Sequence, residues 1–227
     1  MENRPVEIRP YAPGDRVPVR DLAVDTALRG EPGTAFLPDR ELLADLLTGP
    51  FLDLEPGNVF VAVTPEGALA GYIFGSGNFK RLGRAFWPRF LPGIAVRALR
   101  RGLLADTGAR RFLIGAARAG LGGEFGCPAD LAPYPGVLHI NLSRERRGRG
   151  LGSRLLRRFL GHLAAAGTPG VHCGTMSESA RDFFLRNGFL QLCRKRRPFF
   201  DAYAGREVTY FVLAKPLDGA AARAGDV

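Results

Sequence analysis

Apolar residues recur with helical spacing directly after a glycine-rich segment in the second half of the chain. They return every three or four positions, at Leu155, Leu156, Phe159, Leu160 and Leu163. Arginines occupy the opposite face, so the pattern predicts an amphipathic helix. Gly167 should end it, because glycine readily adopts the left-handed conformation that follows helix C-termini. An apolar run at 137–142 precedes the glycines, and this part of the chain therefore reads as strand, turn and helix.

Shorter apolar runs predict the remaining elements. The expected strands cover residues 6–9, 58–63, 68–75, 137–142, 170–175, 190–195 and 208–214, and the expected helices cover residues 15–28 and 41–47. The second and third of these strands flank residues 64–67, whose Thr-Pro-Glu-Gly sequence is typical of a hairpin turn. We expect one α/β domain over residues 1–217 and a flexible tail over residues 218–227.

Residues 77–136 separate the hairpin from the next strand, and their length predicts a helical insertion. Within it, apolar residues oppose arginines at helical spacing, which predicts a basic amphipathic helix. The apolar set is Ile94, Val96, Leu99, Leu103 and Leu104, and the basic set is Arg97, Arg100 and Arg101. Two interpretations stay open: a docked helix with a solvated arginine face, or a lid or partner surface near an acceptor.

Three glycines at alternate positions follow the strand at 137–142. Gly148, Gly150 and Gly152 allow a tight backbone turn whose N–H groups, with the positive end of the next helix, suit a bound phosphate. A Walker loop would need a lysine after the last glycine, and Ser153 stands there instead. A dinucleotide fingerprint would need glycine at position 153 and an acid about twenty residues later, so that interpretation fails as well.

The remaining pattern, Arg147-x-x-Gly150-x-Gly152, resembles the pyrophosphate loop of the GNAT superfamily of acyl-CoA N-acyltransferases. Downstream, residues 180–189 (Ala-Arg-Asp-Phe-Phe-Leu-Arg-Asn-Gly-Phe) resemble a second GNAT motif, in the family's order and spacing. More narrowly, four short segments look like the subgroup related to the acetyltransferase-like domain of O-GlcNAcase. They are Trp87-Pro88, Tyr134-Pro135, Leu138-His139-Ile140 and Gly170-Val171-His172.

The resemblance implies a GNAT fold: a mixed, largely antiparallel sheet with splayed central parallel strands, flanked by helices, with the helical insertion between the third and fourth strands. It also implies acetyl-CoA as the acyl donor, with no metal. Ile140 and Leu142 would bind the pantetheine arm through the main chain, and the Leu142 amide would polarise the thioester carbonyl. Amides of Arg147, Gly148, Arg149, Gly150, Leu151, Gly152 and Ser153 would hold the pyrophosphate, and Ser177 and Phe184 would border the donor.

The expected catalytic positions depart from the GNAT pattern. The family's proton-donating tyrosine falls at Phe184, which has no hydroxyl, so we expect low turnover unless water, Ser177, Tyr134 or Tyr203 substitutes. His139 is the candidate general base, because it shares a strand face with Asn141 and titrates near neutrality, although a hydrogen-bonded core histidine is the alternative. Glu124 and Asp130 are second choices. We assign His172 and Cys173 to packing and His162 to the helix surface.

Charge and cysteine content narrow the functional class. The 227 residues carry a formal net charge of +10. Residues 1–78 hold 6 basic and 12 acidic side chains, residues 79–123 hold 10 basic and one acidic, and the remainder is net +7. The basic charge therefore lies in the insertion and around the glycines. Three scattered cysteines, Cys127, Cys173 and Cys193, show no metal-ligand spacing, and no apolar run is long enough to span a membrane.

These observations favour a cytoplasmic N-acyltransferase that moves an acetyl or other short acyl group to an unknown amine, on a small molecule or a protein. A catalytically weak GNAT-like module that binds acyl-CoA or a partner is the alternative, favoured by Phe184, Asn141 and Ser177. Nucleic-acid binding ranks third, because the basic segment lacks spaced aromatics and a recognised motif. A homodimer is compatible with the sequence.

Overall fold

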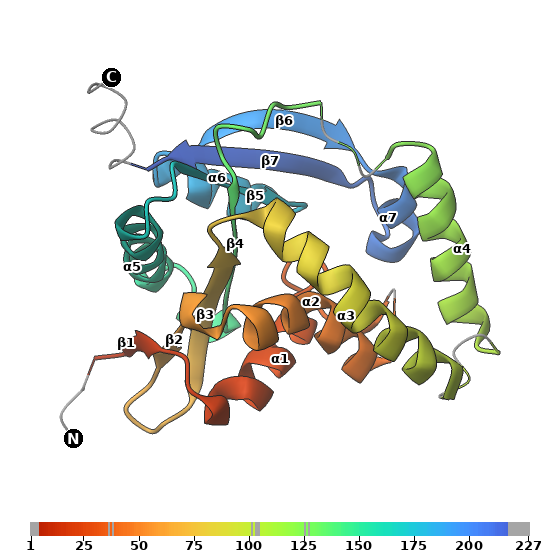
Figure 1. Cartoon of the computed structure of the whole chain (residues 1–227), viewed down its shortest axis with the longest axis horizontal. Helices are drawn as coiled ribbons and strands as arrows, with labels where there is room; N and C mark the ends of the chain where they lie inside the picture. Colours follow the sequence, from red (N-terminus) through yellow and green to blue (C-terminus); the bar gives the residue numbers. More distant parts are fainter. Residues whose placement is uncertain are drawn as a thin grey trace.

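Seven strands form one sheet in the computed structural model, which describes residues 5–217 apart from 36, 38, 101, 103, 104, 125 and 127. The strands are β1 (Glu7–Pro10), β2 (Val59–Val63), β3 (Leu69–Ser76), β4 (Gly136–Leu142), β5 (Gly170–Thr175), β6 (Leu190–Arg196) and β7 (Thr209–Pro216). They lie in the order β1-β2-β3-β4-β5-β7-β6, and β4 and β5 are its parallel pair (Figure 1). The predicted mixed, largely antiparallel sheet is confirmed.

Helices cover both faces of this sheet. They are α1 (Arg16–Asp25), α2 (Arg40–Leu54), α3 (Phe79–Arg100), α4 (Thr107–Leu121), α5 (Leu151–Ala165), α6 (Glu178–Arg186) and α7 (Pro198–Ala204). In Figure 1, α1, α2 and α3 lie in front of the sheet, α5 and α6 lie toward its left, and α4 and α7 stand together at the right. Among the described residues, no helix is long and apolar enough to cross a membrane.

The sheet separates two apolar cores. On the α5 side, Leu155, Phe159 and Leu163 are almost fully buried against alternate residues of β2 to β5, which confirms the predicted amphipathic helix. Gly167, with φ of 79°, follows its end as expected. On the other side, Val19 and Ala23 of α1 pack against Tyr72 and Phe74 of β3. Side chains at alternate positions of the central strands therefore belong to different sides of the molecule.

Several boundaries differ from the sequence prediction. The first helix ends at Asp25 rather than at residue 28, because the chain turns there into a tight hairpin. The second continues to Leu54 through Pro50, which lies buried in its interior. Helix α7 was not predicted; it is short, and its aromatic residues Phe199 and Tyr203 pack against Phe112 of α4. Tertiary contacts stabilise these helical turns more than local propensity does.

The insertion forms helices α3 and α4, as predicted, but the predicted apolar face of α3 is wrong. Val96 and Leu99 are 46% and 61% exposed, whereas Ile94 packs against the α1–α2 core. Phe90 lies over Gly49 of α2 at ordinary van der Waals distance, where an added Cβ would be 3.6 Å from the ring. Arg97 points toward α2 rather than into solvent alone. The remaining predicted members of the two faces, Arg101, Leu103 and Leu104, lie outside the described residues, as do Cys127 and the predicted tail at 218–227.

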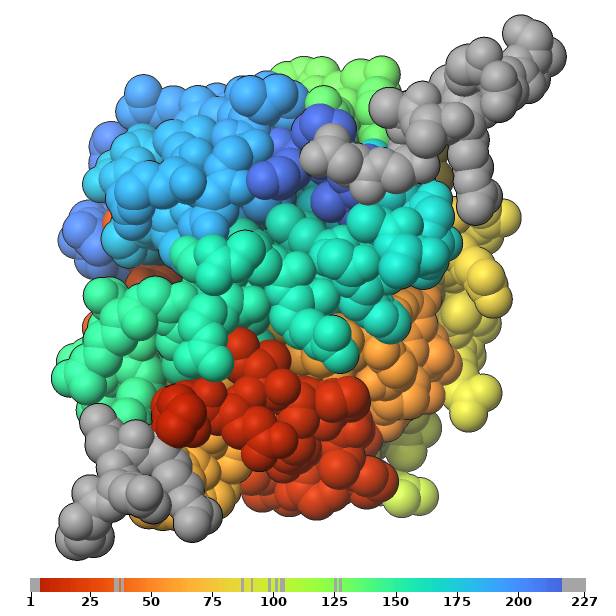
Figure 2. Space-filling model, turned by 90° about the vertical axis from the view of Figure 1, so that its left-hand side faces the viewer, coloured from red at the N-terminus to blue at the C-terminus, as the bar shows by residue number. Residues whose placement is uncertain are grey.

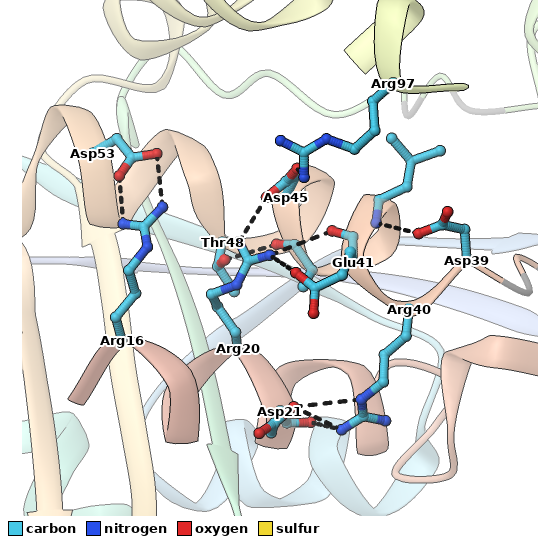
Figure 3. Close-up of polar contacts among 12 residues, drawn as sticks. Arg16, Arg20, Asp21, Asp39, Arg40, Glu41, Asp45, Thr48, Asp53 and Arg97 are labelled. Atoms are coloured by element: carbon cyan, nitrogen blue, oxygen red, sulfur yellow. Dashed lines mark hydrogen bonds and ion pairs between the residues drawn. The ribbon is translucent and has the colours of Figure 1, made fainter. Parts of the chain in front are cut away.

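Ion pairs join the three front helices, as Figure 3 shows. Asp45 of α2 accepts a 2.7 Å hydrogen bond from Arg20 of α1 and also pairs with Arg97 of α3. Arg20 contacts Glu41 as well, and its side chain is only 12% exposed. Asp45 therefore connects the insertion to the body of the domain through one shared, partly buried carboxylate.

Replacement of this shared carboxylate should cost more stability than replacement of a surface one. We expect Asp45→Asn to lower the free energy of unfolding by about 1–3 kcal/mol, because two arginines lose a charged partner. Asp21→Asn is the matched control: its side chain is 52% exposed and Arg40 keeps Asp25, so the loss should stay below about 0.5 kcal/mol. Urea titrations measure both, and equal losses would contradict the central role of Asp45.

Candidate active site

The parallel strands β4 and β5 pair only at their beginnings. Their register pairs are Gly136 with Val171 and Val137 with His172, and the strands then separate. We call the space beyond these pairs the β4–β5 gap. Although β4 is the central strand, residues 140–142 remain partly accessible, whereas Gly136 and Leu138 are buried. The gap therefore exposes the second half of a central strand, as the predicted splay requires.

Backbone polar groups of β4 face this gap. The Ser143 N–H donates to the Ala70 carbonyl at 3.0 Å, which continues the antiparallel ladder between β3 and β4. Because hydrogen bonding alternates along an antiparallel pair, the N–H and C=O groups of Ile140 and Leu142 point away from β3 and toward the gap. The Leu142 carbonyl accepts from Arg147 Nε at 3.2 Å. The two residues predicted to bind a donor through the main chain thus present their backbones to the gap.

The glycine loop, residues 147–153, follows at the end of β4. Gly148 and Gly150 have φ of 73° and 75°, and Gly150 is the N-cap of α5. A side chain at Gly150 would meet nothing within 4 Å, so the left-handed backbone, rather than lack of space, favours glycine there. At Gly152 the reason is space, since an added Cβ would lie 3.2 Å from the Phe183 ring. The loop presents exposed amides at a helix N-terminus, an arrangement that suits an anion.

Tyr72, His139 and Asn141 form a polar cluster on the α1 side of the sheet. The Asn141 amide donates to the Tyr72 hydroxyl at 2.9 Å, and that hydroxyl lies 3.3 Å from His139 Nδ1. A Tyr72 hydroxyl that donates to Nδ1 leaves the proton of a neutral His139 on Nε2, and the opposite direction of this bond would place that proton on Nδ1. Tyr72 was missed from the sequence because it lies in an apolar run, and only the strand register sets it opposite Asn141.

Burial controls the ionisation of this cluster. Part of His139 stays accessible, but the surrounding protein desolvates its ring and lowers its pKa from 6.5 to about 4. Phe74 stacks on the same ring at 5.2 Å. Burial also raises the pKa of the Tyr72 hydroxyl. Both groups are therefore neutral at pH 7, and His139 accepts a proton only weakly.

Ser177 and Phe184, the other predicted donor contacts, have structural roles at α6. The Ser177 hydroxyl caps the helix by accepting from the Ala180 N–H at 3.4 Å. Phe184 is 4% exposed and lies in the core between the rings of Phe183 and Phe189. Neither position carries the phenol that the resemblance would require, and contact of either residue with a donor stays a prediction.

The second-choice residues lie outside the polar cluster. The Glu124 carboxylate accepts from the Phe199 N–H at 3.2 Å, and Tyr203 packs at the contact of α4 with α7. Asp130 is exposed and closes a turn by accepting from Ala132. The Tyr134 carbonyl interacts with His172 Nδ1 at 2.7 Å, and burial lowers the pKa of that histidine. The structure therefore gathers none of these groups around His139.

Two further assignments concern packing. Cys173 is 2% exposed, and burial raises the pKa of its thiol, as expected for an inert core residue. His162 is not a surface residue as predicted: it is partly buried, lies 2.8 Å from Asn58 Oδ1 and contacts the Phe60 ring. Within the described part of the chain, no group of three or more His, Cys, Asp or Glu residues could hold a metal ion.

Solved structures of other proteins have the same arrangement of strands and helices. No protein-family model matches the sequence. SsHAT is 27% identical over 94% of this chain and 99% of its own, with a TM-score of 0.70. A GNAT superfamily phosphinothricin acetyltransferase (Pat) from Sinorhizobium meliloti, in complex with AcCoA, is 17% identical over 96% of this chain and 91% of its own, with a TM-score of 0.56. A third structure is yncA from Salmonella typhimurium with its cofactor acetyl-CoA. It is 15% identical over 95% of this chain and 95% of its own, with a TM-score of 0.55.

The structural neighbours of this chain are thus GNAT superfamily acetyltransferases, and the sheet with its parted β4 and β5 is the GNAT fold. The predicted superfamily resemblance is confirmed at the level of the fold. The resemblance to the subgroup of the O-GlcNAcase acetyltransferase-like domain stays a prediction.

Burial of His139 predicts a pH-dependent stability. Between pH 6.5 and about 4 the unfolded chain binds a proton at this residue more readily than the folded chain. The contribution is therefore complete above pH 6.5 and is lost as the pH falls through this window, by at most about 3 kcal/mol. Urea titrations from pH 7 to pH 4 should give a shallower decline for His139→Gln than for the parent.

Tyr72→Phe separates burial from hydrogen bonding, because it keeps the ring that buries His139 and frees Nδ1. A slope equal to that of the parent would assign the low pKa of His139 to burial alone. An unchanged slope in His139→Gln would assign the pH dependence to other groups.

Proposed function

We propose that this protein is an acyl-CoA-dependent N-acetyltransferase that transfers an acetyl or other short acyl group to an amine. The observation that carries the proposal is the β4–β5 gap: the backbones of Ile140 and Leu142 face it, and it ends at the glycine loop on the N-terminus of α5. The structural neighbours that are acetyltransferases support the same reaction class, acyl transfer from acyl-CoA.

In this proposal, the chain binds acetyl-CoA with the main chain more than with side chains. Amides of residues 147–153 hold the pyrophosphate, since several N–H groups and the helix dipole act on one anion. The Ile140 and Leu142 backbones hydrogen-bond the pantetheine arm along the gap. The Leu142 N–H stabilises charge on the thioester oxygen during transfer. Ser177 and Phe184 border the donor from α6.

The polar cluster faces the acceptor. The amine nitrogen forms a bond to the acyl carbon and loses one proton, the carbon–sulfur bond breaks, and the departing thiolate takes up one proton. At neutral pH, His139 with its proton on Nε2 can donate a hydrogen bond from that nitrogen without any rearrangement. To act as the base, it requires the Tyr72 hydroxyl to turn away, so that Nδ1 can accept the proton. Asn141 and Tyr72 therefore decide which of the two roles His139 performs.

The alternative is a binding module without useful turnover. The observation that favours it is Phe184, a core residue without a hydroxyl at the position of the family's tyrosine. A donor that binds tightly, with no thiol release over a broad panel of amines, would favour this alternative.

Calorimetry with acetyl-CoA tests the glycine loop directly. Gly150→Val should lower the affinity at least about tenfold, because a β-branched residue at φ of 75° distorts the loop amides. Gly161→Ala is the matched control in α5: an added Cβ there meets nothing within 4 Å. It should bind like the parent and be slightly more stable. Equal binding by a folded Gly150→Val variant would contradict the assigned loop.

Restoring the phenol tests the limit on turnover. If protonation of the departing thiolate is slow, Phe184→Tyr should raise kcat at least about tenfold in a thiol-release assay. Burying the new hydroxyl should lower stability by about 1–3 kcal/mol. Phe183→Tyr adds the same group to the neighbouring ring and should not raise kcat. Equal rates for the parent and both variants would mean that the proton comes from another group or that another step limits turnover.

A further inference from the structure

A tight hairpin turn follows helix α1. Leu28 and Glu31 exchange two backbone hydrogen bonds of 2.9 Å each, around Arg29 and Gly30. Both central residues have positive φ, 59° at Arg29 and 95° at Gly30, which is the geometry of a type I′ turn. Among the described residues, Arg29 is the one non-glycine with positive φ. An arginine therefore occupies a position that favours asparagine, aspartate or glycine, a form of strain that is enriched at functional sites.

Arginines of the segment after β4 hold this turn at the open end of the gap. Arg144 pairs with Glu31 at 2.7 Å. The Arg147 guanidinium lies directly over Gly30, where an added Cβ would be 3.0 Å from Nη1. The same side chain donates from Nε to the Leu142 carbonyl at the end of β4. The position of Arg29 is thus determined by three contacts that do not involve its own side chain.

In the view of Figure 2, a small red-orange part of the N-terminal segment is visible between the green loop before α5 and the light-blue region of α6. This view shows the α5 side of the molecule, with α5 in teal across its middle. The turn after α1 is joined to the end of β4 by Arg147, which contacts both Gly30 and the Leu142 carbonyl. It follows α1, whose Val19 and Ala23 pack against Tyr72 on the face of the sheet opposite α5.

The Arg29 side chain has little to satisfy its charge there. Its Nε is buried and has no hydrogen-bond partner. The charged groups that act on it are Arg206, in the segment before β7, and Glu178, the exposed first residue of α6. Burial and Arg206 both lower the pKa of Arg29, whereas Glu178 raises it. An anion at this position would satisfy the unpaired Nε and offset the repulsion between Arg29 and Arg206.

We propose that Arg29 and Arg206 bind an anionic group, a carboxylate or a phosphate, on the amine that accepts the acyl group. This inference rests on the proposed function and names its acceptor class. We assign the anion to the acceptor rather than to the donor, because in the proposed function the donor phosphates already have the loop amides as ligands.

We do not assign binding of the acceptor anion to the arginines of the insertion. Arg97 is paired with Asp45 on α2, so one of its three predicted arginines is already neutralised. Arg100 is exposed and serves as a control for surface charge.

Matched pairs of amines test the proposal: glycine against glycinamide, and phosphoethanolamine against ethanolamine. The parent chain of 227 residues should use the anionic member of a pair with a higher kcat/KM. Arg29→Gln should raise KM for the anionic member about 10- to 100-fold and leave the neutral member unchanged, because a charge-assisted hydrogen bond is lost. Arg206→Gln should act in the same direction, and Arg100→Gln should match the parent. The Kd for acetyl-CoA should stay unchanged in every variant.

Two measurements separate this role from a structural one. Arg29→Gly relieves the positive φ, so it should raise Tm while the preference for anionic amines is lost. NMR titration of the products, N-acetylglycine against N-acetylglycinamide, in the presence of CoA, gives the same comparison without turnover.

Equal use and equal binding of both members by the parent would overturn the proposal. So would a loss of acetyl-CoA affinity in Arg29→Gln, since that result would assign Arg29 to the donor phosphates. Failure of the parent itself to bind acetyl-CoA would instead overturn the proposed function.

Discussion

The early end of hydrogen bonding between β4 and β5 is the constraint on which the site depends. A central strand normally satisfies its backbone on both sides, but the second half of β4 has β3 on one side and the gap on the other. Backbone groups without a strand partner need another hydrogen-bond partner, because an unpaired buried N–H or C=O costs free energy. Arg147 contacts the Leu142 carbonyl, and the amides of Ile140 and Leu142 face the space that an extended pantetheine arm would fill. The second half of β4 therefore lacks strand hydrogen bonds on its β5 side, which is where the proposed function places the acyl donor.

Alternation along β4 then separates the face proposed for the donor from the face proposed for the acceptor. Ile140 and Leu142 belong to the α5 side, where the glycine loop lies, whereas His139 and Asn141 meet Tyr72 on the α1 side. The thioester would be reached between the two faces, with phosphate chemistry on one and amine chemistry on the other. The low pKa of His139 follows from the same arrangement, because the aromatic rings that position the imidazole also exclude water from it.

Charge is balanced differently in two regions of the molecule. The front helices satisfy their ions internally: Asp45 serves Arg20 and Arg97, and Arg40 contacts Asp21 and Asp25. At the open end of the gap the balance differs, because Arg144 and Arg147 position a turn whose own Arg29 keeps an unpartnered Nε. The net charge of +10 is therefore a weak guide by itself. The positive charge relevant to an acceptor is local, and it comes from segments that the net total does not distinguish.

Short-range sequence patterns by themselves determined many of the secondary-structure elements of this protein. The period of the apolar residues in α5, the strands around the hairpin and the glycines after β4 were all readable, because helical spacing, alternation and positive φ depend on near neighbours. Tertiary structure alone decided the rest. The buried face of α3 follows from the packing of Ile94 and Phe90 on α2, α7 from its contact with α4, and the environments of Tyr72 and Arg29 from a register and a turn. Residues 30 and 147, or 72 and 141, meet only when the sheet is assembled, and no local periodicity encodes a contact between segments so far apart in the chain.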